Sequence, residues 1–334
     1  MMKAIVQDKY GSPDDVLQLR EINKPVVGDD EVLVRVRAAS VHPDVWHLVT
    51  GRPYVLSLMG AGVLKPKNPV PGTDMAGLVE SVGKDVTRFG PGDEVFGETH
   101  TELQWRNGGA FAEYVSVPQD ALALKPNGIT FEQAAAVPTS GFIALHNLQS
   151  GGQIQPGQSV LSNGAGGGVG TIAVQLAKAY GACVTGVDST EKMEMVRSLG
   201  ADHVIDYTQE DFTQSGQQYD LILAANGYHP IADYKRALRP QGIYVCSGGS
   251  LAQIFQAGIL GRLMSKTGGK QMGNLAHSQN HDDLVFVSEL LGAGKIVPVV
   301  DRQYPLNELP EAFRYFGEGH ARGKVIITVA HDDD

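Results

Sequence analysis

Residues 162–178 read SNGAGGGVGTIAVQLAK, a glycine-rich stretch that runs directly into an apolar, helix-like one. Small residues recur in the spacing A-x-G-x-x-G at Ala165, Gly167 and Gly170, and the strand-like run SVLSN precedes them at 159–163. Small side chains allow a sharp turn and a close backbone approach to a phosphate, and a helix N-terminus supplies free N–H groups. The order of strand, glycine turn and helix therefore predicts a dinucleotide-binding βα turn rather than a flexible loop.

The chain after about residue 129 alternates strand-like runs with helical ones. Strand-like runs occupy 159–163, 183–188, 203–207, 219–225 and 242–249. In the helical stretch after the glycine loop, Ile172, Leu176 and Tyr180 fall on one face, as in an amphipathic helix. Strand–helix alternation at this spacing predicts an α/β fold with a doubly wound parallel sheet of the Rossmann type.

Residues 1–128 are β-rich instead. In EVLVRVRAASV, which begins at Glu31, valines alternate with Arg35 and Arg37, as in a half-buried strand. Turn sequences such as GSPDD, PGTD and FGPGDEVFG separate the short apolar runs. This part predicts a small barrel or sandwich. A helix over 281–293 and a closing strand, KVIITVA, follow the alternating region.

Composition narrows the function classes. A chain of 334 residues favours two domains, and its net charge of −10 does not suit a binder of nucleic acid or anionic membranes. The two cysteines, Cys183 and Cys246, lie in apolar runs and are too few for a four-thiolate zinc lobe. No signal peptide and no apolar run of about 18 residues is visible, so we expect a soluble cytoplasmic protein.

The dinucleotide should be held by the loop and by the ends of the next two strands. On the loop we expect contacts from Ala165, Gly167, Gly168, Val169 and Gly170. Asp188 ends the following strand and is placed to bind ribose hydroxyls, which favours NAD. Ser189, Lys192 and Tyr207 are nearby and together suit a 2′-phosphate, so the balance slightly favours NADP, with NAD left open.

Two further loops follow strands of the predicted sheet. Asn226 follows the fourth strand, and Ser247 and Gly248 follow the fifth. Ligands bind beyond the carboxyl ends of such strands, so these residues should border the nicotinamide half of the cofactor.

The stretch SVHPDVWHLVTG at 40–51 places His42, Asp44 and His47 within six residues. Three such ligands suit a catalytic zinc. In a helix, however, only Asp44 and His47 would share a face at i, i+3, with His42 on the other side. Metal binding, acid–base chemistry and simple packing all remain open for this stretch on its own residues.

Several motifs together give a family resemblance. NPVPGTDMAGLVESVGKDVTRFGPGDEVFG, GGAFAEYVSVP, NGAGGGVG, LGADHVIDY and GHARGKVIITV resemble the medium-chain dehydrogenase/reductase superfamily, and most closely its zinc-free, quinone oxidoreductase-like branch. The resemblance implies a GroES-like catalytic domain formed by residues 1–128 and 271–334, with a Rossmann domain inserted at 129–270. It also implies an active site in the cleft and a homodimer paired through the Rossmann sheets. The candidate edge for this pairing is KQMGNLAH at 270–277. The resemblance further implies a C-terminal motif in which Lys324 contacts the cofactor.

The resemblance also bears on the metal. Zinc-dependent relatives carry ligands where this chain has His42, Thr73 and Ala136, and neither threonine nor alanine can replace a ligand there. Zinc-free relatives usually read Asn-Pro-x-Asp-Trp where this chain reads His42-Pro43-Asp44-Val45-Trp46. Since the aspartate is shifted by one place, its family role does not transfer, and no bound metal is expected.

Reduction of a quinone or an α,β-unsaturated carbonyl fits a site without zinc. Hydride addition to the conjugated carbon builds charge on oxygen, which needs one hydrogen-bond donor and a proton source. The candidate donors are Tyr54, His42, Asp44 and Thr73, although solvent is an alternative proton source. The apolar wall of a substrate pocket is expected from Tyr54, Val55, Leu56, Leu58, Met59, Val63 and Leu64.

The sequence therefore predicts an NAD(P)H-dependent oxidoreductase acting on a small hydrophobic quinone or enone. Two alternatives stay open. One is a nucleotide-binding redox sensor with little turnover, which the altered HPDVW motif suggests. The other is a zinc-type alcohol dehydrogenase with a rebuilt metal site.

Overall fold

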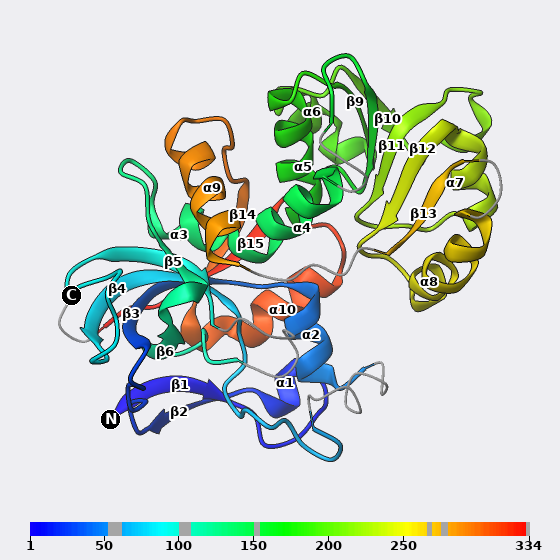
Figure 1. The fold of residues 1–334 in the computed structure, drawn as a ribbon. Coiled ribbons are helices and arrows are strands. Elements are labelled where there is room, and N and C mark those ends of the chain that lie inside the picture. Colours follow the sequence, from blue (N-terminus) through cyan, green and yellow to red (C-terminus); the bar gives the residue numbers. More distant parts are fainter. Residues whose placement is uncertain (53–61, 100–107, 150–153, 266–268, 275–279, 332–334) are drawn as a thin grey trace. The chain divides into compact units, whose positions relative to one another are not determined.

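The protein is described by a computed structural model that covers residues 1–52, 62–99, 108–149, 154–265, 269–274 and 280–331. The chain forms two compact units (Figure 1). The first unit consists of Met1–Thr139, Ser278–Gly294 and Pro298–Asp334, and the second of Ser140–His277 and Lys295–Val297. The first unit is thus discontinuous, and its divisions fall after Thr139 and before Ser278, where the sequence suggested 128 and 271.

The second unit contains a parallel sheet, six-stranded within the described residues, in the order β10-β9-β8-β11-β12-β13. Its strands are β8 (Ser159–Asn163), β9 (Cys183–Asp188), β10 (His203–Asp206), β11 (Tyr219–Ala224), β12 (Leu238–Cys246) and β13 (Gln271–Asn274). The strand order reverses between β8 and β11. In doubly wound sheets a ligand crevice opens at such a reversal, beyond the carboxyl ends of the strands.

The helices of the second unit follow from this order. They are α4 (Pro138–Gln149), which starts at the unit boundary, α5 (Gly168–Ala179), α6 (Met193–Ser198), α7 (Ile231–Ala237) and α8 (Leu251–Ser265). Because parallel crossovers are right-handed, α5 and α6 cover one face of the sheet and α7 and α8 the other (Figure 1). The predicted alternation is confirmed, except that β12 begins at Leu238, before the run expected at 242.

The first unit is built on a sheet that is seven-stranded within the described residues. Its order is β14-β15-β3-β4-β5-β7, and β6 also pairs with β3. The strands are β3 (Glu31–Ser40), β4 (Asp74–Val82), β5 (Glu94–Glu98), β6 (Tyr114–Pro118), β7 (Leu122–Leu124), β14 (Val300–Pro305) and β15 (Lys324–Thr328). A separate two-stranded sheet is formed by β1 (Met2–Val6) and β2 (Gln18–Ile22). Only β14 and β15 run parallel among these pairs, so the expectation of a β-rich unit is confirmed.

Helices close the first unit around an apolar core. They are α1 (Pro13–Val16), α2 (Pro43–Thr50), α3 (Phe131–Ala135), α9 (His281–Gly292) and α10 (Leu309–Gly317). The valines of β3 pack with Met75 and Val95 of the neighbouring strands and with Phe313 of α10. Strand β15 pairs with β3 through Ile326↔Ser40, so the last strand of the chain completes a sheet begun near its start.

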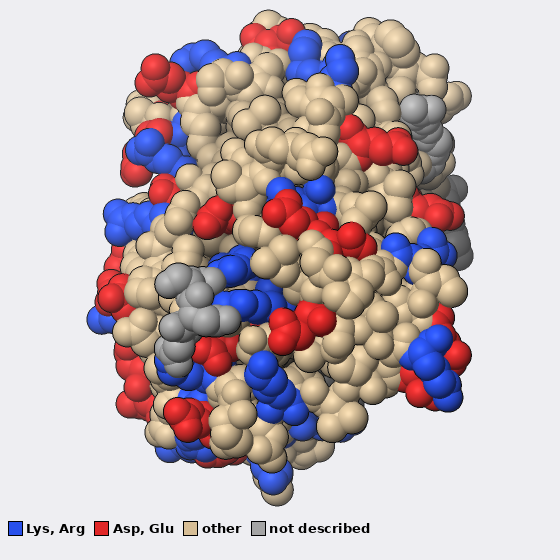
Figure 2. Space-filling model, turned by 90° about the vertical axis from the view of Figure 1, so that its left-hand side faces the viewer, with Lys and Arg blue, Asp and Glu red and all other residues tan. Residues whose placement is uncertain are grey.

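Charge and hydropathy agree with the composition. On the face shown in Figure 2, acidic and basic side chains are interspersed, and no single sign dominates. None of the helices in the described residues is both long and apolar enough to cross a membrane. Of the two cysteines, Cys246 is buried and Cys183 half-buried, and both are free thiols.

Gly77 offers a test of the central β3–β4 pairing. A Cβ at this position would lie 2.1 Å from the carbonyl oxygen of Arg35 on the neighbouring strand. Gly77→Ala should therefore force the strands apart and lower the free energy of unfolding by about 1–3 kcal/mol. Gly90→Ala is the control, since its Cβ would meet nothing within 4 Å. Chemical denaturation measures both, and equal stability of the two variants would contradict the prediction.

Candidate functional site

The glycine loop has the geometry of an anion cradle. Gly164 has a φ of 87°, a conformation that favours glycine, and it turns the chain out of β8. A Cβ on Gly170 would lie 2.0 Å from the Gly164 carbonyl oxygen, so this position needs glycine for the helix to start so close to the strand. Gly167 is the N-cap of α5, and no side chain caps it, which leaves the first-turn N–H groups for a ligand.

Asp188 closes this loop from the end of β9. Its carboxylate accepts hydrogen bonds from the N–H of Gly166 at 2.7 Å and from its own neighbour Ser189 at 2.9 Å. The ammonium of Lys192 lies 3.7 Å from the same carboxylate, and both side chains are only 9% exposed. Asp188 therefore shapes the loop, and Lys192 compensates its charge. The sequence indicated neither of these contacts.

Two tyrosines lie beyond the ends of β10 and β11. Tyr207 follows β10, and its ring lies 5.5 Å from that of Tyr228, centroid to centroid. Both side chains are roughly half exposed. Sequence reasoning missed Tyr228, although an aromatic residue two places after Asn226 was a usable signal. The pair forms an aromatic surface at the carboxyl edge of the sheet.

The loops after β8, β11 and β12 interlock at the reversal of strand order. The N–H of Asn226 donates to the Asn163 carbonyl at 3.1 Å. The N–H groups of Ser247 and Gly248 both donate to the Ala224 carbonyl. The hydroxyl of Ser247 is buried and has no hydrogen-bond partner within the described residues.

These features of the second unit fit a dinucleotide. The uncapped N-terminus of α5 suits a pyrophosphate. The Asp188–Lys192 pair is attached to the same loop, because the Asp188 carboxylate accepts a hydrogen bond from the Gly166 N–H. The orphaned Ser247 hydroxyl is a polar group that a ligand would satisfy. The loop residues named from the sequence, Ala165 to Gly170, lie between the end of β8 and the first turn of α5.

In the first unit, Asp74 is the centre of a buried polar cluster. Its carboxylate, which is fully buried, accepts hydrogen bonds from the Ser40 hydroxyl at 3.0 Å and the Thr139 hydroxyl at 2.5 Å. The Lys324 ammonium lies 3.2 Å away and is itself 5% exposed. Lys324, expected from the sequence to bind the cofactor, thus pairs with a carboxylate of its own unit.

His42 and Asp44 begin α2. His42 is the N-cap residue, and its Nδ1 accepts a hydrogen bond from the Asp44 N–H at 3.3 Å. The Asp44 carboxylate lies 3.5 Å from the same Nδ1. The expectation that His42 would stand across the helix from Asp44 is wrong, because an N-cap residue lies outside the helical repeat. His47 turns away, with its Nδ1 2.7 Å from the carbonyl oxygen of Arg52.

The environment of Asp44 changes its acidity. Burial and, to a lesser degree, repulsion by the Asp74 carboxylate raise the pKa of Asp44, the Lys324 ammonium partly opposes both, and the result is a pKa of about 6. Asp44 is therefore a carboxyl group that exchanges its proton near neutral pH, which suits acid–base chemistry. The sequence named Asp44 as a candidate, but its charged neighbours come from β4 and β15.

The remaining predicted residues of this unit divide into three groups. The hydroxyl of Thr73 is buried and has no partner within the described residues, so it is a candidate donor. Tyr54 and the wall residues Val55 to Met59 lie outside the described residues. Val63 and Leu64 are 69% and 89% exposed, so these two do not form a buried wall.

The donor set here does not fit a catalytic zinc. Thr73 and the buried Ala136 occupy two of the positions that carry ligands in zinc enzymes, and the Asp74 carboxylate already faces an ammonium group. His42 and His47 point to different partners. Within the described residues, no three histidine, cysteine or acidic side chains gather in a way that suits a metal.

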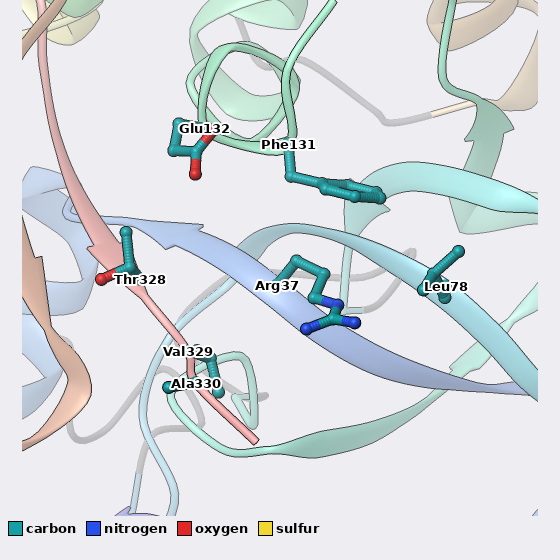
Figure 3. A pocket seen from close by; sticks show the side chains of 7 residues that line it. All are labelled: Arg37, Leu78, Phe131, Glu132, Thr328, Val329 and Ala330. Carbon is teal, nitrogen blue, oxygen red and sulfur yellow. The ribbon is translucent and has the colours of Figure 1, made fainter. Parts of the chain in front are cut away.

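A separate hollow of about 400 Å³ lies in the first unit (Figure 3). In Figure 3, Arg37 of β3 lies at the centre of this hollow, with Phe131 and Glu132 above it and Leu78 to its right. The other lining residues are Thr328, Val329 and Ala330. None of the residues predicted from the sequence lines it, so it is distinct from the cluster around Asp74.

The raised pKa of Asp44 predicts a pH-dependent cost to folding. Below about pH 3 the carboxyl is protonated in both the folded and the unfolded chain. Between about pH 4 and pH 6 only the unfolded chain ionises, so the free energy of unfolding falls by up to about 3 kcal/mol and levels off above pH 6. Asp44→Asn should therefore gain stability relative to the parent protein between pH 4.5 and 7.5, measured by thermal unfolding. Asp15→Asn, an exposed first-turn aspartate of α1, is the control, and a pH-independent difference for Asp44→Asn would contradict the prediction.

Comparison with known proteins gives the family. The family model "Alcohol dehydrogenase GroES-like domain" matches residues 28–127, and "Zinc-binding dehydrogenase" matches 199–327. The NADPH-dependent alkenal/one oxidoreductase of Arabidopsis thaliana is 33% identical, over 98% of this chain and 79% of the relative. The 2-methylene-furan-3-one reductase of Solanum lycopersicum is 32% identical, with the same coverage of both chains.

Solved structures agree. The quinone oxidoreductase from Coxiella burnetii superposes with a TM-score of 0.85 at 28% identity, covering 98% of this chain and 99% of that one. Similarity to these proteins over 98% of this chain, together with the GroES-like and Rossmann units described above, confirms the expected fold class. The chain belongs to the medium-chain dehydrogenase/reductase superfamily of oxidoreductases, in its quinone oxidoreductase-like branch.

Proposed function

We propose that this enzyme uses NADPH to reduce quinones and α,β-unsaturated carbonyl compounds, without a catalytic zinc. The observation that carries the proposal is the Asp44 carboxyl, which burial and Asp74 keep protonatable near neutral pH. The names of the relatives, which include an alkenal/one oxidoreductase and a quinone oxidoreductase, support this substrate class.

The second unit supports nucleotide binding. The first-turn N–H groups of α5 would hold the pyrophosphate, and Asp188 keeps the loop in shape through Gly166. When bound, the reduced nicotinamide supplies the hydride. The buried Ser247 hydroxyl and the Asn226 loop would hold the cofactor at the strand reversal.

The first unit supports the proton chemistry. When hydride adds to a carbon conjugated to a carbonyl, negative charge moves onto the carbonyl oxygen, which must be stabilised and then protonated. Asp44 would provide the proton, and His42, whose Nδ1 it faces at 3.5 Å, would orient that carboxyl. The orphaned Thr73 hydroxyl is a second donor for the oxygen. Tyr54 stays a candidate donor from the sequence alone.

The preference for NADPH rests on Lys192. Its ammonium compensates Asp188, which would otherwise repel a 2′-phosphate. Ser189 directly follows Asp188 in the sequence, and Tyr207 directly follows the end of the neighbouring strand β10. The name of the Arabidopsis relative also specifies NADPH.

We also propose that the protein is a cytoplasmic homodimer. Strand β13 is the last strand of its sheet, and its outer edge pairs with no strand among the described residues. Such an edge suits pairing with a second copy.

Steady-state kinetics test the reductase proposal. NADPH oxidation should occur with a panel of quinones and enones and should be much slower with simple aldehydes. Asp44→Asn should reduce kcat by about 10–100-fold, flatten the pH profile near 6 and leave NADPH binding unchanged. A protein that binds NADPH but reduces nothing in the panel would instead support the sensor alternative.

Substitution of Lys192 tests the cofactor preference. Lys192→Ala leaves the Asp188 charge uncompensated, so the affinity for NADPH should fall about tenfold more than that for NADH. Fluorescence titration with each nucleotide measures this ratio. Lys178→Ala, which removes another lysine–aspartate pair of the same unit, is the matched control. An equal loss of affinity for both nucleotides would argue against NADPH selection by Lys192.

A further inference from the structure

Tyr234 of α7 is a fully buried tyrosine whose hydroxyl bonds to the loop that precedes its own helix. The residue is 0% exposed. Its hydroxyl accepts hydrogen bonds from the side-chain amide of Asn163 at 2.8 Å and from the Tyr228 N–H at 3.3 Å. Asn163 ends β8, and Tyr228 lies in the loop 225–230, which connects β11 with α7. The hydroxyl therefore joins the end of β8 to the loop after β11.

The ring of Tyr234 belongs to the apolar core of the second unit, but the hydroxyl is not needed for that packing. The ring centroid lies 4.5 Å from that of Tyr244 and 6.0 Å from that of Phe212. A phenylalanine ring would fill the same space. Burial of a hydroxyl is unfavourable unless hydrogen bonds offset it, and these bonds go to Asn163 and Tyr228. The hydroxyl thus contributes to the loop rather than to the core.

Asn163 and Tyr234 together anchor the backbone N–H groups of this loop. The Asn163 carbonyl accepts hydrogen bonds from the N–H of Ala225 at 2.9 Å and from that of Asn226 at 3.1 Å. The Tyr234 hydroxyl accepts the bond from the N–H of Tyr228. Because the Asn163 amide also donates to the Tyr234 hydroxyl, the two anchors form one connected network. The conformation of the loop depends on this network.

The loop carries exposed side chains at the carboxyl edge of the sheet. Asn226 is exposed, and Tyr228 is 46% exposed with its ring 5.5 Å from that of Tyr207. The ring of His229 lies 4.3 Å from the other side of the sequence neighbour pair, against Tyr228. Exposed aromatic faces suit stacking with a flat ring. Since the Tyr228 N–H is bonded to Tyr234, the place of this aromatic surface depends on the Tyr234 hydroxyl.

We propose that Tyr234 is a positioning residue for the nucleotide. Its hydroxyl and Asn163 hold the loop in one conformation, in which Asn226 and Tyr228 are presented to a bound dinucleotide. Tyr234 is itself buried, so it acts through the loop rather than by touching the nucleotide. A loop that is ordered beforehand loses less conformational freedom when the ligand binds, which increases affinity. This inference rests on the proposed nucleotide binding by the second unit.

The hydroxyl of Tyr234 performs this role as a neutral group. Burial is the largest of the effects that raise the pKa of Tyr234 to about 12, and the hydrogen bonds from Tyr228, His229 and Asn163 oppose it. The hydroxyl therefore keeps its proton between about pH 6 and pH 9. Its contribution to nucleotide binding should not change over that range, whereas the Asp44 carboxyl titrates within it.

Nucleotide titration of a variant without the hydroxyl tests the proposal. Tyr234→Phe keeps the ring but leaves the Tyr228 N–H without its acceptor. The Kd of NADPH should therefore rise about tenfold, by the same factor at about pH 6 and pH 9. At saturating NADPH, kcat should stay within about twofold of the parent value, because no reacting group has changed.

Tyr219→Phe is the matched control. Tyr219 is 1% exposed in the same apolar core, begins β11 at the amino end of the strand, and bonds through its hydroxyl to Thr185. Its loss should alter the Kd of NADPH by less than about twofold, since the loop after β11 keeps its anchors. An equal loss of affinity in both variants would show a general packing effect and overturn the proposal.

Hydrogen exchange in the absence of nucleotide gives a second readout. In Tyr234→Phe the Tyr228 amide should exchange at least about tenfold faster than in the parent protein, because its acceptor is gone. In Tyr219→Phe the same amide should exchange as in the parent protein. Unchanged exchange of this amide in Tyr234→Phe would contradict the anchoring role directly.

A double-mutant cycle with Asn163→Leu shows whether the two anchors act together. If they do, the double variant loses little more affinity for NADPH than the weaker-binding single variant. A parent protein that binds no NADPH would refute the proposed nucleotide binding itself. A parent protein that binds NADPH, combined with equally tight binding by Tyr234→Phe or with strictly additive losses in the cycle, would overturn the positioning role alone.

Discussion

The buried ion pair between Asp74 and Lys324 is the contact on which the first unit depends. The two residues are 250 positions apart, and the whole second unit is inserted between them. A buried carboxylate is tolerable only when its oxygens are paired, and Ser40 and Thr139 complete its hydrogen bonds. The same group of contacts thus joins the end of β3, the start of β4, the start of α4 and the start of β15.

This contact also connects the fold with the proposed chemistry. The Asp74 carboxylate raises the pKa of Asp44, while Lys324 limits the increase. Because Asp74 is fully buried and is held by Ser40 and Lys324 of neighbouring strands and by Thr139 of α4, the position of its charge relative to α2 is set by tertiary packing. His42, the N-cap residue of α2, accepts a hydrogen bond from the Asp44 N–H and so holds the first turn that carries Asp44. The chemistry expected of this unit is therefore a property of its sheet as much as of the HPDVW motif.

In the second unit the corresponding constraint is steric. Gly170 must lack a side chain because its Cβ would lie against the Gly164 carbonyl oxygen, and Gly248 must lack one because its Cβ would lie 2.2 Å from the Ala225 carbonyl oxygen. The loops after β8, β11 and β12 can then approach one another at the strand reversal. The nucleotide-binding potential of this edge follows from the close backbone packing together with the Asp188–Lys192 pair. Helix α8, which follows β12, differs from these closely packed loops because several of its apolar side chains are exposed.

Local pattern alone determined much of this protein: the strand–turn–helix at 159–178, the strand runs, the β-rich start and the residue types of the cofactor loop. These features depend on hydrophobic period and glycine placement, which are properties of neighbouring residues. The sequence also showed which zinc ligands were missing, at Thr73 and Ala136. Tertiary structure alone decided that Lys324 faces Asp74, that His42 contacts Asp44, that Lys192 pairs with Asp188 and that Phe255 is exposed. Each of these depends on which distant strand or helix lies opposite a side chain, and burial and charge pairing between remote segments leave no local pattern.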